Sequence, residues 1–387
     1  MNFLLTSELI EFRDLLRKFL ADKFSAESRR KNLLVNENTK VAPRFDTALW
    51  KELAELGVFS APMDENCGGL GFGARALQVI LEESARRLLQ LPLFETLVLG
   101  AIPIRQLATE TNAVELLSAI ADSSLRVSSS QTVWHHLACS DVLSEQAKAM
   151  QAKGAGEKWV LTGTLVFVPA YSQVNAIVVP VLKKSGKSFE CALFLFETGT
   201  KGILESPLES LDLVRQYSNL TLKNVTARML SDGWFALERL KDVALQIEVG
   251  VAAELAGVAA EGLEMTVEYV KVREQFGKPI GTFQAIQHKL ADMCLWSEQV
   301  CALGRFAAHA IEVDKGQFTG SAIAAKSLAA ELVPKVMESA IQAHGGIGFT
   351  FEYDLHLYLR RARALAALGL GRSEGYLALA EARINGV

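Results

Sequence analysis

The part of the chain after about residue 233 constrains the fold most strongly, because helical periodicity continues through it with few interruptions. Apolar residues recur at three-to-four spacing in four long segments, which glycine-containing breaks separate. These segments cover residues 235–273, 282–312, 319–343 and 354–383. Long helices joined by short turns bury their apolar stripes against one another, so this region predicts a four-helix bundle.

Shorter segments of two kinds precede the bundle. Helical patterning covers residues 7–25, 46–56, 74–89 and 93–121. After Leu125 the pattern changes to short β-branched or aromatic runs at 156–169, 174–182, 188–196 and 217–225, typical of antiparallel strands. Helices, then strands, then helices predict an α+β fold with segregated domains. We expect an N-terminal α-helical domain (1–122), a middle antiparallel β-barrel domain (123–230) and a C-terminal four-helix-bundle domain (231–387).

Composition narrows the possible partners. The net charge is −4, and the chain has no basic stripe, so nucleic acid is not expected to bind. No window of eighteen uncharged apolar residues occurs, and the acidic start is unlike a signal peptide, so no membrane span is predicted. The five cysteines form no CxxC pair, which indicates free thiols in a reducing cytoplasm. His135 and His136 have no third ligand at metal-binding spacing, so no metal is expected.

A turn interrupts the bundle pattern at residues 272–281, which read Val-Arg-Glu-Gln-Phe-Gly-Lys-Pro-Ile-Gly. By itself this is a helix end, a turn and the start of an Ala-rich helix. Arg273 would then lie at the negative end of a helix dipole. A guanidinium can also donate two parallel hydrogen bonds to phosphate oxygens.

A second turn, Gln-Ala-His-Gly-Gly-Ile-Gly at residues 342–348, contains three glycines in four positions. Glycines let the backbone approach a bulky group and direct its amides at a phosphate. Alone, the pattern is better explained by a plain helix–helix turn. We expect His344, within this turn, to be satisfied by backbone groups rather than by a ligand.

In this order, about 70 residues apart and within one bundle, the two turns resemble the acyl-CoA dehydrogenase family. The first is similar to its Arg-x-x-Phe-Gly turn and the second to its Gln-x-x-Gly-Gly-x-Gly signature. Residues 352–362 resemble the family's next helix, and the Gly-Gly-Leu-Gly turn at 68–71 matches more loosely. The resemblance covers most of the chain and implies the family's fold.

The resemblance also implies FAD held at a subunit interface in a dimer or tetramer. The positions matched to the diphosphate pocket are Arg273, Gln275, Phe276 and Gln284. The positions matched to the adenosine-diphosphate portion of a neighbouring subunit's flavin are Gln342, Gly345 and Gly346. The implied partners are an acyl-CoA substrate and an electron-transferring flavoprotein.

The catalytic base departs from the usual pattern. Dehydrogenation needs a carboxylate that removes the α-proton while the β-hydrogen leaves as hydride to the flavin. In most of the family this is a Glu nine residues after the Arg that Arg360 matches, and that position here is Gly369. A minority of relatives place it 26 residues before the Arg turn. That count reaches Ile247, with Glu248 adjacent, so Glu248 is the candidate base.

Alternatives to this base remain open. Glu374 follows the usual loop position by five residues, and Glu254 lies on another face of the same helix as Glu248. The base could also be absent from this chain and be supplied by a partner. The flavin-contacting loop of relatives, Thr-Glu-Pro-x-x-Gly-Ser-Asp, is replaced by Val-Ser-Ser-Ser-Gln-Thr-Val-Trp at 127–134, where Ser129, Ser130 or Thr132 could still donate hydrogen bonds.

Three functions are compatible with these features. The first is an acyl-CoA dehydrogenase with an atypical base, which forms a 2,3-enoyl-CoA. The second is one subunit of a heteromeric acyl-CoA dehydrogenase, as in some bacterial relatives, possessing a base or only sharing a flavin site. The third is a flavin monooxygenase on the same fold. The first two share flavin-dependent acyl-CoA dehydrogenation, which is the predicted function.

Overall fold

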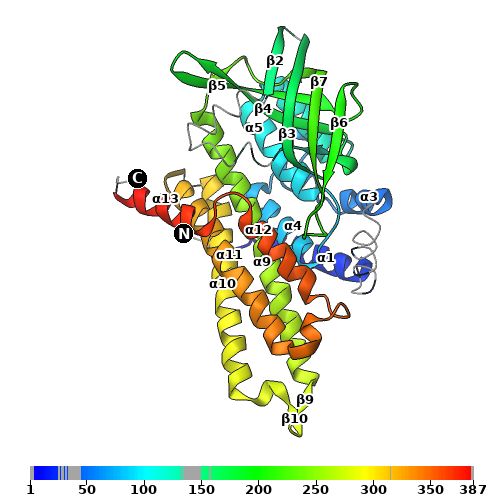
Figure 1. The fold of residues 1–387 in the computed structure, drawn as a ribbon, viewed down its shortest axis with the longest axis vertical. Coiled ribbons are helices and arrows are strands. Elements are labelled where there is room, and N and C mark those ends of the chain that lie inside the picture. The colour runs from blue at the N-terminus through cyan, green and yellow to red at the C-terminus, as the bar shows by residue number, and fades with distance from the viewer. Residues whose placement is uncertain are drawn as a thin grey trace.

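The computed structural model describes residues 4–24, 45–130, 150–156, 158–313 and 315–384, together with residues 27, 30, 33, 132 and 134. It confirms the expected fold class: a helical N-terminal part, a mainly antiparallel sheet and a helical bundle (Figure 1). The sheet lies at one end of the long axis, and a short hairpin between two long helices lies at the other (Figure 1).

The N-terminal part consists of helices, three of which begin at side-chain caps. The hydroxyls of Thr6 and Thr109 and the carboxylate of Asp46 each accept a hydrogen bond from a backbone N–H three residues later. The helices are α1 (Ser7–Lys23), α3 (Thr47–Glu55), α4 (Gly73–Arg86), the π-helical η2 (Glu95–Gly100), α5 (Ala101–Leu107) and α6 (Glu110–Ala121).

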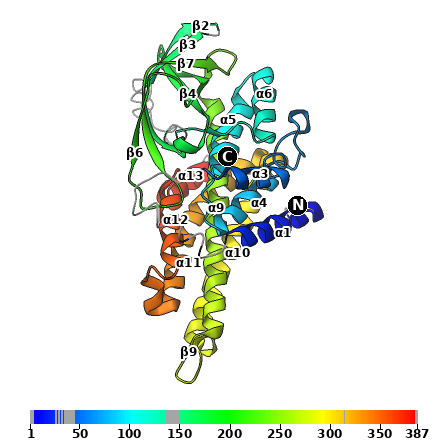
Figure 2. The same cartoon turned by 90° about the vertical axis from the view of Figure 1, so that its right-hand side faces the viewer.

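The middle part is an eight-stranded sheet with its own apolar core around Phe194 and Leu220. Its strands are β1 (Val127–Ser128), β2 (Met150–Ala155), β3 (Lys158–Pro169), β4 (Ala176–Ser185), β5 (Ser188–Glu197), β6 (Ile203–Leu208), β7 (Tyr217–Met229) and β8 (Phe235–Ala236). The main path is β1-β4-β5-β7-β3-β2, and every pair is antiparallel except β1 with β4. The sheet curves beside the upper end of the bundle (Figure 2).

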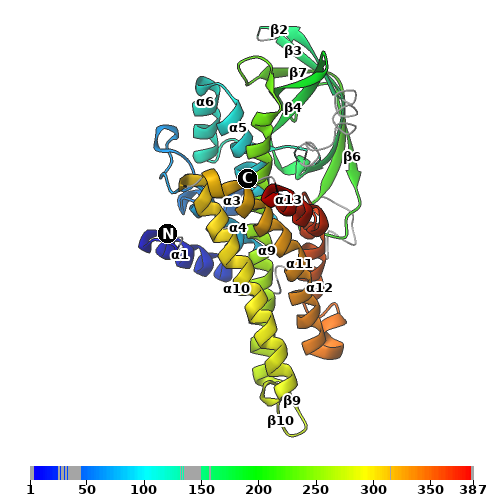
Figure 3. The same cartoon turned by 90° about the vertical axis from the view of Figure 1, so that its left-hand side faces the viewer.

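The C-terminal part is built around one long, buried helix, α9 (Glu238–Val272). The other helices are α10 (Gln284–Val313), α11 (Lys315–His344), α12 (Leu355–Ala367) and α13 (Arg372–Ile384). Helix α9 is long and apolar enough to cross a membrane, yet 83% of its most apolar window is buried inside the protein. A bundle's core helix has this character. Figure 3 shows α10 and α11 running alongside it.

Close contact between the N-terminal part and the bundle depends on one glycine. A Cβ at Gly257 of α9 would lie 2.1 Å from the carbonyl oxygen of Glu82 in α4. No side chain fits there, so the two helices approach through their backbones. This contact fixes α4 against the same helix that carries the candidate base.

Two sequence-based expectations need correction. The segment 354–383 is not one helix, because α12 ends at Ala367 and α13 begins at Arg372. Gly369 between them has a φ of 65°, which a continuous α-helix does not allow. Strands β2 and β6 were also not expected: β6, Ile-Leu-Glu-Ser-Pro-Leu, is mostly exposed and does not alternate apolar and polar residues. The domain limits at residues 122 and 230 stay predictions.

Candidate active site

The turn after α9 carries the first group of predicted flavin residues. Arg273 caps the helix, and its N–H donates to the carbonyl oxygen of Tyr269 at 2.9 Å. The following residues form the hairpin of β9 (Glu274–Gln275) and β10 (Lys278–Pro279). At its tip Phe276 has a left-handed φ of 54° and is 93% exposed. The end of α9 and the hairpin therefore carry a cation and an exposed apolar ring close together in the chain.

The second group lies where α11 ends. Residues Gly345–Phe349 form the 3-10 helix η5, which Gly345 enters with a φ of 63°. A Cβ at Gly345 or at Gly346 would meet no atom within 4 Å, so open space lies over both residues. The backbone here is accessible to a ligand, as a phosphate-binding turn requires.

Tyr269 and His344 join the two groups. Their rings stack with centroids 4.1 Å apart, and the Tyr269 hydroxyl donates to the His344 carbonyl oxygen at 3.3 Å. His344 is buried, and its Nδ1 contacts the Ala340 carbonyl oxygen at 2.8 Å, whereas its buried Nε2 has no hydrogen-bond partner among the described residues. Backbone groups therefore satisfy only one of the two ring nitrogens. Tyr269 lies one helical turn before Arg273, so this contact brings the Arg turn and the Gly turn to the same end of the bundle.

These residues fit the phosphate-bearing part of FAD. All of the predicted contacts are exposed in the single chain: Arg273, Gln275, Phe276, Gln284, Gln342, Gly345 and Gly346. A guanidinium and accessible backbone amides are the donors that phosphate oxygens accept. Because the same surface is open and carries the exposed Phe276 ring, it also suits a site that a second subunit covers.

The candidate base lies in the interior, against the loop between α12 and α13. Glu248 on α9 is 2% exposed, and its Oε1 accepts a hydrogen bond from the Leu370 N–H at 3.1 Å. A Cβ at Gly369 would stand 2.0 Å from Glu248 Oε1 and 2.5 Å from both Cδ and Oε2. The carboxylate from α9 thus occupies the space beside the loop position where most of the family has its Glu.

Glu254, the second carboxylate on α9, has a different environment. Its oxygens accept hydrogen bonds from Arg215 at 3.1 and 3.2 Å and from Arg361 at 2.8 Å. Arg215 also pairs with Glu95 at 2.5 Å, and Arg361 with Asp212 at 2.6 Å. All five side chains are buried. Glu254 is therefore the centre of an ionic cluster that links η2, the loop before β7, α9 and α12.

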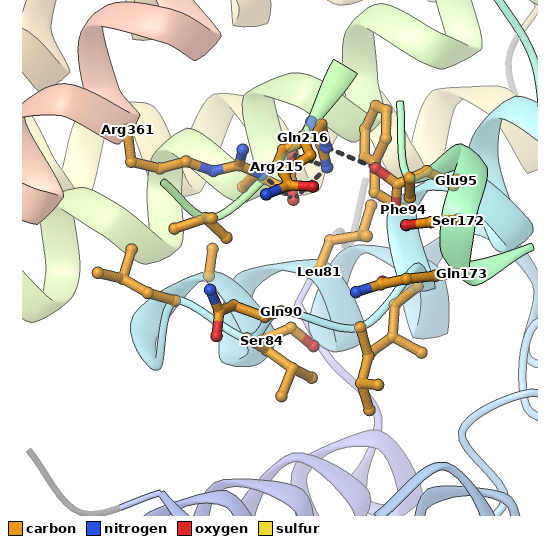
Figure 4. A pocket seen from close by; sticks show the side chains of 18 residues that line it. Leu81, Ser84, Gln90, Phe94, Glu95, Ser172, Gln173, Arg215, Gln216 and Arg361 are labelled. Atoms are coloured by element: carbon orange, nitrogen blue, oxygen red, sulfur yellow. Dashed lines mark hydrogen bonds and ion pairs between the residues drawn. The ribbon is translucent and has the colours of Figure 1, made fainter. Parts of the chain in front are cut away.

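This cluster borders a small pocket with both polar and apolar lining residues (Figure 4). Arg215 and Arg361 lie on one side, and Leu81, Ser84 and Gln90 lie on the other (Figure 4). The cavity measures about 30 Å³, which admits a water molecule or two but not an acyl chain. Burial raises the pKa of the Glu95 carboxyl, against the opposing charge of Arg215. At this volume the pocket is too small to hold an acyl chain.

The remaining candidates lie elsewhere. Glu374 is exposed in the first turn of α13, where its Oε2 accepts from the Gly371 N–H at 3.4 Å. Ser130 is buried and donates to the Val166 carbonyl oxygen at 2.6 Å, and Ser129 Oγ accepts from the indole N–H of Trp134 at 3.1 Å. These hydroxyls have partners within the protein. His135 and His136 lie outside the described residues.

One residue near the base escaped the sequence analysis. Lys326 on α11 is fully buried, and its Nζ donates to the carbonyl oxygens of Ala366 at 3.4 Å and Leu370 at 3.0 Å. It stands alone in an Ala- and Leu-rich stretch at residues 322–330. A single lysine on the apolar face of a core helix was an available signal, since charged side chains are rarely buried without partners.

Comparisons with known proteins agree with this fold. The N-terminal domain of acyl-CoA dehydrogenases matches residues 6–124, and the C-terminal domain matches residues 245–384. The probable acyl-CoA dehydrogenase YngJ of Bacillus subtilis is 28% identical, covering 91% of this chain and 92% of its own length. The short-chain specific acyl-CoA dehydrogenase of Megasphaera elsdenii is 30% identical, covering 80% and 82%. The solved steroid ACAD Tcur3481-Tcur3483 is 32% identical over 98% of both chains, with a TM-score of 0.81.

The fold, together with two turns whose residues fit phosphate groups, is that of a flavin-dependent dehydrogenase. The chain belongs to the acyl-CoA dehydrogenase family. Its activity is the oxidation of an acyl-CoA thioester, and its cofactor is FAD.

Proposed function

We propose that this chain supplies its own catalytic base, Glu248, to an acyl-CoA dehydrogenase whose flavin sites lie between subunits. The single observation that carries the proposal is the contact between Glu248 and Gly369. The loop position has no side chain and a left-handed φ, and the Glu248 carboxylate fills the space beside it. A carboxylate in this position on α9 requires a glycine on the loop, because a side chain on the loop would displace it.

The residues present perform the proton-transfer half of the reaction. The Glu248 carboxylate removes the α-proton of the thioester, and the Leu370 N–H holds Oε1 in position through the 3.1 Å hydrogen bond. Bound FAD supplies the acceptor for the β-hydrogen, which leaves as hydride. Glu254 is less suited to this task because two guanidiniums hold it. Glu374 is exposed, where bulk water competes for the proton.

The length of α9 argues for a site shared between chains. Arg273 follows Glu248 by 25 residues, which at the rise of an α-helix places them about 37 Å apart. The ribityl chain between the flavin ring and the diphosphate is much shorter. Glu248 and Arg273 of one chain therefore serve different flavins, and each complete site needs two chains. A dimer or tetramer satisfies this requirement.

The partner chain is either a second copy or a homologous subunit. The likeness to the steroid ACAD Tcur3481-Tcur3483 supports a heteromer and a bulky acyl group. We further propose that electrons pass to an electron-transferring flavoprotein. We also propose that the protein is cytoplasmic, as the free cysteines among the described residues suggest. A purely non-catalytic partner subunit and a flavin monooxygenase remain the alternatives, and neither requires the Glu248–Gly369 contact.

The decisive experiment is anaerobic flavin reduction by a panel of acyl-CoA thioesters. We expect Glu248→Gln to retain FAD and to slow reduction by about 10²–10⁴-fold, the usual contribution of a general base. Glu238→Gln, at the exposed start of the same helix, is the matched control and should reduce at the wild-type rate. Wild-type rates in Glu248→Gln would exclude Glu248 as the base. The same conclusion would follow if only Glu374→Gln, and not Glu248→Gln, slowed flavin reduction to this extent.

The preparation itself tests the choice of partner. A yellow, oligomeric protein purified alone and bleached by an acyl-CoA indicates a homo-oligomer. A colourless chain that takes up FAD only with a homologous subunit indicates a heteromer, in which Glu248→Gln of this chain should still stop reduction. If the co-expressed complex stays fully active with Glu248→Gln, the base belongs to the other subunit.

A further inference from the structure

The buried lysine on α11 lies within the structure that surrounds the candidate base. Lys326 is fully buried, and its side chain extends to the end of α12 and the loop that follows it. Ala366 belongs to the last turn of α12, whose carbonyls have no partner within the helix. A cation at a helix C-terminus also interacts favourably with the helix dipole. Lys326 therefore fixes the point at which α12 ends and the loop begins.

The peptide groups of one loop residue connect this lysine to the base. The Leu370 carbonyl oxygen accepts from Lys326 Nζ at 3.0 Å, and the Leu370 N–H donates to Glu248 Oε1 at 3.1 Å. The loop is thus held from α11 on one side and from α9 on the other. A shift of the loop away from Lys326 moves the donor that orients the carboxylate.

Helix termination by itself does not require a buried charge at position 326. Burial lowers the pKa of its ammonium, and the carboxylates of Glu248 on α9 and Glu374 on α13 act in the opposite direction. Burying an ammonium carries a large desolvation penalty, and an apolar side chain of similar volume is often equally stable or more stable at such a position. A lysine that serves only packing or helix termination is therefore costly. Its position beside both carboxylates that flank the loop points to the site.

We propose that Lys326 is a positioning residue for proton abstraction, which anchors the loop at residues 368–371 so that Leu370 and Gly369 hold the Glu248 carboxylate in its reactive orientation. This inference rests on the proposed role of Glu248. It assigns Lys326 no contact with substrate or flavin. Its effect should appear in the rate of the chemical step and not in binding.

The test compares Lys326→Met with Lys335→Met in the FAD-loaded oligomer. Lys335 lies on the same helix, is partly exposed and pairs with Glu331 at the surface. We expect Lys326→Met to keep its FAD and its acyl-CoA dissociation constant within about two-fold. Flavin reduction should slow by about 10²-fold, the cost of a small misplacement of a catalytic group. Lys335→Met should match the wild type, and Lys326→Arg, which keeps the charge and donors, should recover at least about tenfold.

Two further measurements distinguish a failure of the Lys326 proposal from a failure of the Glu248 proposal. In the Glu248→Gln background, Lys326→Met should cause little additional loss, because both substitutions disable one unit. Hydrogen–deuterium exchange of the peptide containing residues 368–371 should be faster in Lys326→Met than in Lys335→Met. If Glu248→Gln stays active, the proposed function fails, whatever Lys326 does. If Glu248→Gln is inactive but Lys326→Met reduces flavin within two-fold of wild type, or leaves the exchange unchanged, the inference about Lys326 is overturned.

Discussion

The Glu248 carboxylate occupies the space that a side chain at Gly369 would need, since a Cβ on Gly369 would lie 2.0 Å from Glu248 Oε1. Gly369→Ala must therefore move the carboxylate, and its left-handed φ adds about 1 kcal/mol of strain. We expect flavin reduction to slow by about 10²-fold. Gly371→Ala is the control in the same loop, because its Cβ would stand 3.8 Å from Glu374 Oε2, an ordinary contact. Equal rates in the two variants would show that the space beside residue 369 is unimportant.

The same relationship predicts that the base can be moved. In a Glu248→Gly, Gly369→Glu double variant the carboxylate leaves α9, and the new side chain enters the vacated space from the loop. We expect the double variant to reduce its flavin at least about tenfold faster than Glu248→Gly alone. The left-handed backbone at residue 369 limits this recovery, so wild-type rates are not expected. No recovery in a fully folded, FAD-loaded double variant would contradict a shared position.

Removing the guanidinium of Arg273 should weaken FAD binding. A hydrogen bond to a charged group contributes about 1.5–3 kcal/mol, so Arg273→Gln should raise the FAD dissociation constant about 10–100-fold. Quenching of FAD fluorescence during titration of the apoprotein measures this constant. Lys271→Gln removes an exposed charge two residues away, whose partner is Glu268, and should bind FAD like the wild type. Similar losses in both variants would indicate a general effect of charge rather than a contact.

The buried ionic cluster predicts a large difference between neighbouring arginines. Arg361→Met leaves the carboxylates of Asp212 and Glu254 without one of their cations inside the protein, and should cost about 3–5 kcal/mol of unfolding free energy. Arg363→Met, two residues later, breaks an exposed pair with Glu338 and should cost at most about 1 kcal/mol. Urea unfolding monitored by tryptophan fluorescence compares them. Equal costs would mean that the cluster adds nothing beyond a surface pair.

His344 should make stability depend on pH in the mildly acidic range. Burial lowers the pKa of its imidazole, although the hydrogen bond to Ala340 acts in the opposite direction. The unfolded chain, with a histidine pKa of about 6.5, then binds more protons than the folded chain in the interval below that value. The contribution of His344 is therefore present above about pH 6.5 and is lost as the pH falls through the lower folded pKa.

Unfolding free energies at about pH 7.5 and about pH 5.5 test this dependence. The wild type should lose more stability on acidification than His344→Gln does. His288→Gln replaces an exposed histidine and should keep the wild-type dependence. An identical response of wild type and His344→Gln would remove His344 from the explanation.

The sequence by itself determined the order of the long helices and the positions of the Arg and Gly turns, where we propose that FAD binds. Long segments with helical periodicity became α9, α10 and α11, because burial of an apolar stripe needs only local spacing. The Arg and Gly turns were predictable because the special backbone conformations at Gly277 and Gly345 likewise depend on local residue type. Counting from the Arg turn also pointed to Glu248, although one residue off the expected position.

Only the tertiary structure decided which carboxylate faces the loop and what surrounds it. Glu248 and Glu254 lie on one helix, and their sequence context does not show that the first contacts residues 369 and 370 while the second lies between Arg215 and Arg361. Those partners are separated from α9 by tens to more than a hundred residues, so no local pattern encodes the contacts. The same holds for Lys326, whose carbonyl partners belong to another helix and the following loop. Packing of α9, α11 and α12 against one another brings these groups together, and their burial gives each charge its consequence.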